Sequence, residues 1–178
     1  MKKVLLVLGM VALTFSMKSQ SDTFTYPNKG EQLELQYVII EKEGTAGENY
    51  NKLLNYIVKN YKNPDVVIKS KIDGDYIRME GIMSAFSHKE GGTRLDTKFH
   101  YEFKFKNNKM RIELISLKSG VSNGHISSYA TSSKIYKKDG SKRKLWDAYA
   151  TRTVEAANYI LDVIISNMDS QVNDDDNW

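Results

Sequence analysis

The chain of 178 residues contains no cysteine, and this absence narrows what the protein can be. Without cysteine there is no disulfide framework, no thiol nucleophile and no residue to carry the lipid of a lipoprotein. Stability must therefore come from an apolar core, and a chain of this length is long enough to build one as a single domain.

Long hydrophobic runs are also missing. The most apolar stretch, Val4–Phe15, would rise only about 18 Å as a helix, whereas the hydrocarbon core of a bilayer is roughly 30 Å thick. This stretch follows two lysines and precedes a serine-rich zone, which is the layout of a secretory signal. We predict a signal peptide over residues 1–21, cleaved after Ser16, Gln20 or Ser21. The protein is then exported to the periplasm or the extracellular space, and it has no transmembrane span.

The sequence also lacks an excess of positive charge once the predicted signal peptide is removed. The whole chain carries 26 basic and 22 acidic residues, for a net charge of +4. Removal of the signal peptide takes away Lys2, Lys3 and Lys18 and no acidic residue, so the two signs become nearly equal in number. A nucleic-acid-binding protein is expected to keep a clear positive excess or patch. We therefore exclude nucleic acid as a partner.

Motifs for catalysis or metal binding are absent as well. His88, His100 and His125 lack the spacing of a metal site, and we interpret them as solvated surface residues. No Gly-x-Ser-x-Gly elbow is present, and Asp73-Gly74-Asp75 is typical of a hairpin turn rather than a calcium loop. We predict no catalytic, metal-binding or cofactor-binding residues, and a protein that is not an enzyme.

What the sequence does contain is regular alternation of apolar and polar residues. Alternation with a period of two predicts strands, and spacings of three and four predict helices. Asp-Gly and Asn-Asn pairs predict tight turns between neighbouring strands. The predicted strands cover about 33–41, 66–72, 76–83, 99–105 and 110–117; the predicted helices cover 47–62 and about 26 residues from Ser141.

The remaining segments have no such pattern. We predict that residues 22–32 form a flexible or loosely docked lead-in to a single domain at 33–169. We predict that residues 170–178 form an acidic tail. Residues 118–140 are rich in serine and glycine, and are either a functional loop or an element without a clear pattern.

The order of elements predicts an α+β fold with the order β-α-β-β-β-β-α. In such a fold a curved antiparallel sheet carries the helices on one face, and the long C-terminal helix packs across it. The alternating stripe Phe99, Tyr101, Phe103 and Phe105 marks the face of the sheet that meets this helix. Two interpretations stay open: the stripe is closed core, or it lines an apolar pocket beneath the helix.

Four segments carry a resemblance to a known family. They are Tyr50–Ile57, Val67–Ser70, Ile77–Ile82 and the aromatic hairpin leading into Lys109–Ile112. With the element order, they resemble the exported Bacteroidetes family known as a domain of unknown function with a TBP-like fold, over roughly residues 33–120. The resemblance implies a TBP-like fold and no activity. The DNA-binding role of the fold's namesake is not carried over, because a fold does not imply a function.

One cluster of charge has a functional interpretation. Lys137, Lys138, Arg143 and Lys144, together with Lys134 and Lys142, form the densest group of basic residues. They are either a solvated loop and helix start or a surface for an anionic partner.

Two functional hypotheses follow. The first is a non-enzymatic binding or accessory module of the cell envelope that recognises an envelope protein. The alternative is a carrier that holds a small apolar molecule between the sheet and the last helix, with Tyr101, Phe103, Ile160 and Ile164 as lining residues.

Overall fold

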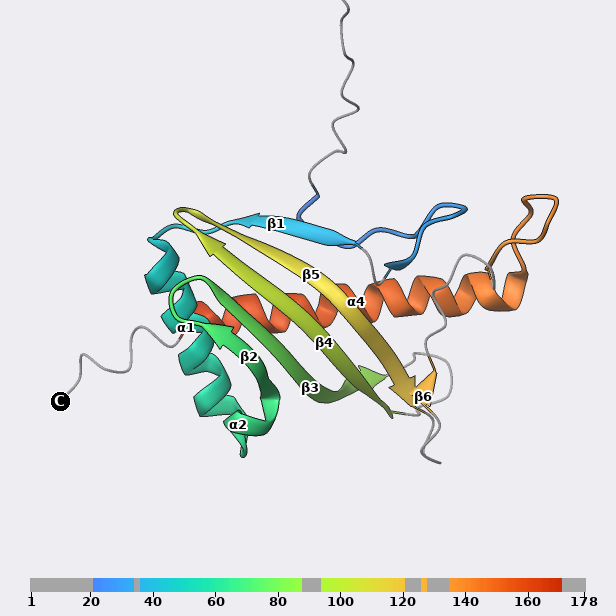
Figure 1. Cartoon of the computed structure of the whole chain (residues 1–178). Helices are drawn as coiled ribbons and strands as arrows, with labels where there is room; N and C mark the ends of the chain where they lie inside the picture. Colours follow the sequence, from blue (N-terminus) through green and yellow to red (C-terminus); the bar gives the residue numbers. More distant parts are fainter. Residues whose placement is uncertain (1–20, 34–35, 88–93, 121–125, 128–134, 171–178) are drawn as a thin grey trace, which may run out of the picture.

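The computed structural model describes residues 21–33, 36–87, 94–120, 126–127 and 135–170 (Figure 1). The elements in chain order are β1 (Tyr37–Glu41), α1 (Ala46–Asn60), α2 (Pro64–Val67), β2 (Ile68–Ile72), β3 (Tyr76–Ser87), β4 (Arg94–Lys106), β5 (Lys109–Gly120), β6 (Ile126–Ser127) and α4 (Lys144–Ser170). The strands form one antiparallel sheet in the order β1-β5-β4-β3-β2, and β6 pairs with β5. The predicted α+β class and element order are confirmed.

The helices α1 and α4 cover one face of the sheet, and in Figure 1 α4 passes behind the strands. All four side chains of the aromatic stripe are at most 2 % exposed on this face, in contact with a core that includes Ile160 and Ile164 of α4. The Tyr101 hydroxyl donates a hydrogen bond of 2.9 Å to the carbonyl oxygen of Ala157. Ala156 and Ala157 of α4 allow this close approach, because their methyl side chains are too small to hold the helix away from the sheet. The stripe is therefore closed core where Tyr101 meets α4.

Both predicted hairpin turns are confirmed. The turn between β2 and β3 places Gly74 at a φ of 75°, and the turn between β4 and β5 places Asn108 at a φ of 61°. Glycine and asparagine are the residues that adopt this left-handed conformation most readily. The two turns set the register of β2 with β3 and of β4 with β5, and so decide which side chains share a face.

The first helix begins with a capping box. The Thr45 hydroxyl accepts a hydrogen bond from the Glu48 backbone N–H, and the Glu48 carboxylate accepts one from the Thr45 N–H.

The strand predicted from Val66 is wrong at its start, because residues 64–67 form the helical turn α2 and β2 begins only at Ile68. Pro64 explains the difference, since its fixed φ suits the first turn of a helix.

The lead-in predicted to be flexible or loosely docked at residues 22–32 is instead firmly docked. Phe24 is 2 % exposed and its ring stacks on Tyr101 at a centroid distance of 5.9 Å. The Asn158 amide binds the backbone of Phe24 on both sides, accepting from its N–H at 2.8 Å and donating to its carbonyl at 2.9 Å. Leu33 is also fully buried. This segment belongs to the core, although its own sequence has no regular pattern.

Residues 118–140, for which a functional loop and an element without a clear pattern both stayed open, are only partly described. Their first residues continue β5 to Gly120, and residues 126–127 form β6. The predictions for residues 1–20, the acidic tail beyond Ser170, and residues 121–125 and 128–134 lie outside the described residues. No helix among the described residues combines the length and apolarity that crossing a bilayer requires.

Candidate functional site

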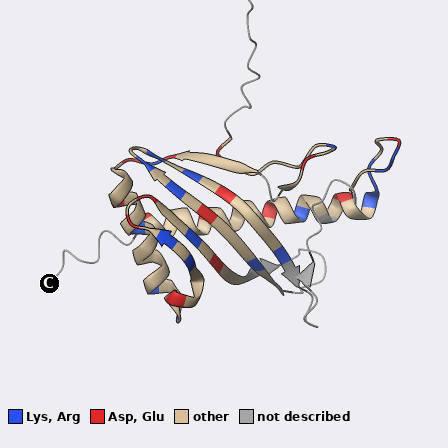
Figure 2. Cartoon of the chain, in the orientation of Figure 1, with Lys and Arg blue, Asp and Glu red and all other residues tan. Residues whose placement is uncertain are grey.

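No helix of the described residues packs on one face of the sheet, and we call this the open face. It is the face toward the viewer in Figure 1, and basic and acidic residues follow one another along its strands in Figure 2. The strand register sets out the rows of side chains that cross it. One row runs Ile72, Tyr76, Lys104, Arg111, Ile39; the next runs Ser70, Arg78, Glu102, Glu113, Tyr37.

Ion pairs link neighbouring strands of the open face. Glu80 accepts from Lys98 at 2.9 Å and from Lys69 at 3.3 Å, and Arg78 pairs with Glu102. Burial alone would raise the pKa of Glu80, but the hydrogen bonds from the two lysines outweigh it and hold this pKa below its usual value. These pairs tie β2, β3 and β4 together.

Like charges also stand opposite one another across β4 and β5. The register pairs Lys98 with Lys118, Lys104 with Arg111, and Lys106 with Lys109, against one opposed acidic pair, Glu102 with Glu113. Directly opposed like charges are unfavourable in a sheet, by up to about 1 kcal/mol relative to neutral pairs. The open face of this hairpin therefore has a local excess of positive charge, although the predicted mature chain is nearly neutral.

His100 lies in the middle of the open face rather than in free solvent, so the surface interpretation needs correction. Its side chain is half-buried, and its Nε2 atom and the Nε atom of Arg78 are both buried without a hydrogen-bond partner among the described residues. Burial is the main cause that lowers the pKa of His100, and the nearby Arg78 guanidinium adds to it. His88 and His125 lie outside the described residues, and no cluster of three metal-ligating side chains occurs among the residues that are described.

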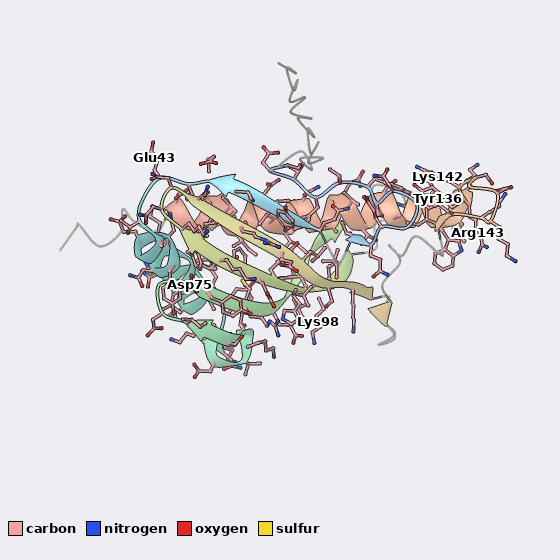
Figure 3. The ribbon with its side chains drawn as sticks, turned by 45° about the horizontal axis from the view of Figure 1, so that its top comes forward. Glu43, Asp75, Lys98, Tyr136, Lys142 and Arg143 are labelled. Atoms are coloured by element: carbon pink, nitrogen blue, oxygen red, sulfur yellow. The ribbon has the colours of Figure 1, made fainter. Side chains whose placement is uncertain are left out.

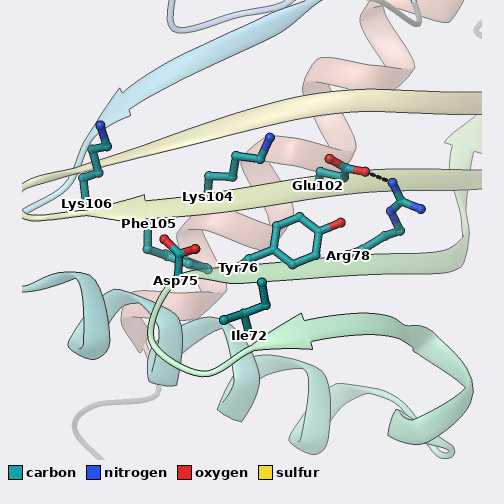
Figure 4. Close-up of a pocket in the computed structure, with 8 residues that line it drawn as sticks. All are labelled: Ile72, Asp75, Tyr76, Arg78, Glu102, Lys104, Phe105 and Lys106. Carbon is teal, nitrogen blue, oxygen red and sulfur yellow. Dashed lines mark hydrogen bonds and ion pairs between the residues drawn. The ribbon is translucent and has the colours of Figure 1, made fainter.

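At the turn end of the open face lies a hollow of about 420 Å³, shown in Figure 4. Its walls come from the β2–β3 turn, from β3 and from the end of β4. Tyr76 lies between Lys104 on one side and Ile72 on the other, and the Arg78–Glu102 pair closes one end. The lining residues are Ile72, Asp75, Tyr76, Arg78, Glu102, Lys104, Phe105 and Lys106.

At the opposite end of the molecule, residues 135–144 form a turn that we call the basic tip (Figure 1). The N–H of Lys137 donates to the carbonyl of Ser141 at 2.8 Å, and the N–H of Arg143 donates to the carbonyl of Ile135 at 2.8 Å. Lys137, Lys138, Arg143 and Lys144 are all exposed, and they gather at this one place. Leu145 is 61 % exposed here too, because α4 begins beyond the edge of the core.

The basic tip is fastened to the docked N-terminal segment. Tyr136 donates to the carbonyl of Pro27 at 3.2 Å, and Tyr26 donates to the Asp147 carboxylate at 2.6 Å. Lys142 pairs with the same carboxylate at 3.1 Å and lies over the Tyr26 ring at 4.0 Å (Figure 3). The hydrogen bond from Tyr26 and the pairing with Lys142 lower the pKa of Asp147. The tip is thereby held in one position.

Sequence reasoning found the four exposed basic residues of the tip but missed one neighbour. The Lys29 ammonium lies next to Gly140, 3.8 Å from where a side-chain carbon would be, and so adds a further cation from the N-terminal segment. No local pattern could have shown this, since more than a hundred residues separate the two positions. The hollow was missed as well, because its lining comes from three strands.

The lining proposed for an apolar carrier is closely packed. Tyr101, Phe103, Ile160 and Ile164 are at most 2 % exposed, and the Tyr101 ring contacts Phe24, Phe99 and Phe103. The hydrogen bond from Tyr101 to α4 leaves no room for a ligand between sheet and helix at that point.

Two solved structures share this architecture. One is a DUF4468 family protein from Bacteroides ovatus ATCC 8483, with a TM-score of 0.55 and 13 % identity, covering 75 % of this chain and 84 % of that one. The other is a TBP-like protein from Parabacteroides distasonis ATCC 8503, with a TM-score of 0.52 and 13 % identity, covering 75 % and 91 %. The fold is TBP-like. At this identity the likeness establishes the TBP-like fold alone, and it agrees with the fold expected from the sequence.

No protein-family model matches the sequence, and comparison with curated proteins gives no match. The TBP-like fold therefore comes without an assigned activity, and function has to be argued from the surface of this chain.

Proposed function

We propose that the protein is an exported, non-enzymatic binding module that recognises an acidic envelope protein through its basic tip. The observation that carries the proposal is the anchored geometry of residues 135–144, which presents Lys137, Lys138, Arg143 and Lys144 together at one end of the molecule. A group of cations fixed in one place attracts a negatively charged partner and orients it.

The anchoring distinguishes this cluster from an ordinary solvated charge run. Such a run needs no support, whereas the tip is supported by the fully buried Ile135 and by the contacts of Tyr26, Tyr136 and Lys142. A rigid surface loses less conformational entropy on binding than a mobile one. The geometry therefore supports a docking surface.

The proposal includes export, which rests on the signal-like start of the chain. Protein recovered from the periplasm or the medium is expected to have lost residues 1–21, or residues 1–16 or 1–20 if cleavage follows Ser16 or Gln20. Mass spectrometry of the recovered protein would show which residues are missing. Only this exported form is suitable as bait.

The test is a cross-linking pull-down from an envelope fraction of the source bacterium. The variant in which Lys137, Lys138, Arg143 and Lys144 are changed to glutamine should lose a partner that the unchanged protein captures at low salt and releases at high salt. The matched control changes Lys52, Lys59, Lys62 and Lys71 to glutamine, which removes the same charge from another part of the surface. Equal capture by both variants would contradict the proposal.

A further inference from the structure

We propose that the hollow on the open face is a binding site for a six-membered ring that carries a carboxylate and at least one hydroxyl group. A uronic-acid sugar and a hydroxylated aromatic acid share this chemistry. The hollow lies at the turn end of the strands, far from the basic tip, so the site is independent of the function proposed above (Figures 1 and 4).

Two lysines beside the hollow carry positive charge that no ion pair among the described residues neutralises. Lys104 and Lys106 are exposed and form no ion pair with any described residue. Each also faces another cation across the strand pair: Lys106 faces Lys109, and Lys104 faces Arg111, which is itself paired with Glu113 at 3.3 Å. Two adjacent like-charge pairs cost stability, and an anion bound between them would relieve the repulsion. A carboxylate fits this position.

The hollow also holds an aromatic ring, that of Tyr76. Tyr76 stands directly opposite Lys104 in the register, with Ile72 opposite it on the other strand. Its hydroxyl points toward Arg78, and Arg78 is held in turn by Glu102 (Figure 4). The ring is thus kept in place beside the lysines. An aromatic face of this kind packs against the flat face of a sugar or another aromatic ring.

The size of the hollow and its acidic lining residues narrow the kind of ligand further. A hollow of about 420 Å³ lies at the small end of the range of ligand pockets and suits a ligand with a single six-membered ring. Asp75 lines the end away from Arg78 and offers a carboxylate that accepts hydrogen bonds from hydroxyl groups. With Glu102 it also disfavours a doubly charged group such as phosphate. A singly charged ring with hydroxyl groups meets all three requirements.

The test measures binding to the purified protein by titration calorimetry and by amide chemical shifts. The probes are glucuronate, 4-hydroxybenzoate, glucose and inorganic phosphate. We expect one of the two ring carboxylates to bind with shifts at residues 72–78 and 102–106, and glucose and phosphate to bind much more weakly. The better of the two ring carboxylates identifies the source as a sugar acid or an aromatic acid.

Two double variants distinguish binding at this site from a general effect of positive charge, and a third variant tests the aromatic ring. Lys104→Gln with Lys106→Gln should weaken binding roughly tenfold or more, because charge-assisted hydrogen bonds are lost. The matched control, Lys62→Gln with Lys118→Gln, removes two exposed lysines that lie outside the hollow and form no ion pair with a described residue, and it should change the affinity less than about twofold. Tyr76→Leu should also weaken binding, since it keeps an apolar side chain but removes the ring.

A stability measurement serves as a second readout. Removing like-charge repulsion should raise the urea midpoint of the Lys104→Gln, Lys106→Gln variant at low salt while it loses affinity. This result also shows that the variant is folded. The proposal is overturned if neither ring carboxylate binds, if phosphate binds as well as they do, or if the two double variants bind alike. None of these outcomes bears on the basic tip.

Discussion

At the residue scale, Gly81 of β3 is a position where no side chain fits. A Cβ atom there would lie 2.6 Å from Cζ of Phe99 and 3.1 Å from the hydroxyl oxygen of Tyr61. Phe99 is fully buried and cannot move aside without disturbing the core. This glycine is therefore required by packing between β3 and β4, and not by its backbone conformation.

The change Gly81→Ala is predicted to lower the free energy of unfolding by about 1–3 kcal/mol, as overpacking of a core typically does. Urea unfolding followed by circular dichroism measures this. Gly47→Ala is the control, because a Cβ atom at Gly47 of α1 meets nothing within 4 Å. It should be neutral or stabilise the protein by about 0.5–1 kcal/mol. An additional Phe99→Leu change should recover part of the loss at Gly81, and a failure to do so would place the clash elsewhere.

At the scale of elements, the docked segment 21–33 differs most from what the sequence predicted for the domain. Phe24 reaches the stripe on β4 and Asn158 of α4 binds its backbone, so this segment joins sheet and helix. All three cleavage positions considered for the signal peptide leave Phe24 in the mature chain.

Phe24→Ala is predicted to lower the free energy of unfolding by about 3–5 kcal/mol, since a buried aromatic ring is lost and a cavity forms. The neighbouring change Thr25→Ala is the control, because Thr25 is exposed and should have an effect within about 0.5 kcal/mol. Thermal and urea unfolding of both variants compares them. Equal stability of the two would mean that the segment is not part of the folded core.

At the scale of the whole molecule, stability is expected to depend on pH through His100. Burial, with the charges of Arg78 on β3 and Lys69 on β2, lowers its pKa against the opposite effect of Glu80 and Glu102. The unfolded chain therefore takes up this proton first as the pH falls. The contribution of neutral His100 is complete above its ordinary pKa of 6.5 and decreases as the pH falls below that value.

The prediction is a urea midpoint that decreases from pH 7 toward pH 5, and a smaller decrease in the His100→Gln variant. Measurements in this window avoid the titration of Glu80 and Asp147, whose pKa values lie below their ordinary values of 4.5 and 3.8. An unchanged slope in the variant would show that other groups cause the dependence.

The surface shows how far the sequence can predict a site. The four basic residues of the tip are close in the chain, and their clustering was evident from the sequence. The hollow was not, because Tyr76, Lys104 and Arg111 become neighbours only through the register of three strands. A shift of one residue in that register would turn each of these side chains toward the other face.

The sequence by itself determined the presence and order of β1 to β5, the two hairpin turns and the long C-terminal helix, but not where each strand begins, because apolar periodicity and turn residues act within a few positions of the chain. It also determined that the aromatic stripe would be the buried face. Only the tertiary structure decided that residues 21–33 dock on this core, that Lys29 joins the basic tip, and that opposed cations border a hollow. Those contacts form between segments that are distant in the sequence. A local pattern carries no information about which residue will lie across the sheet or beneath the helix.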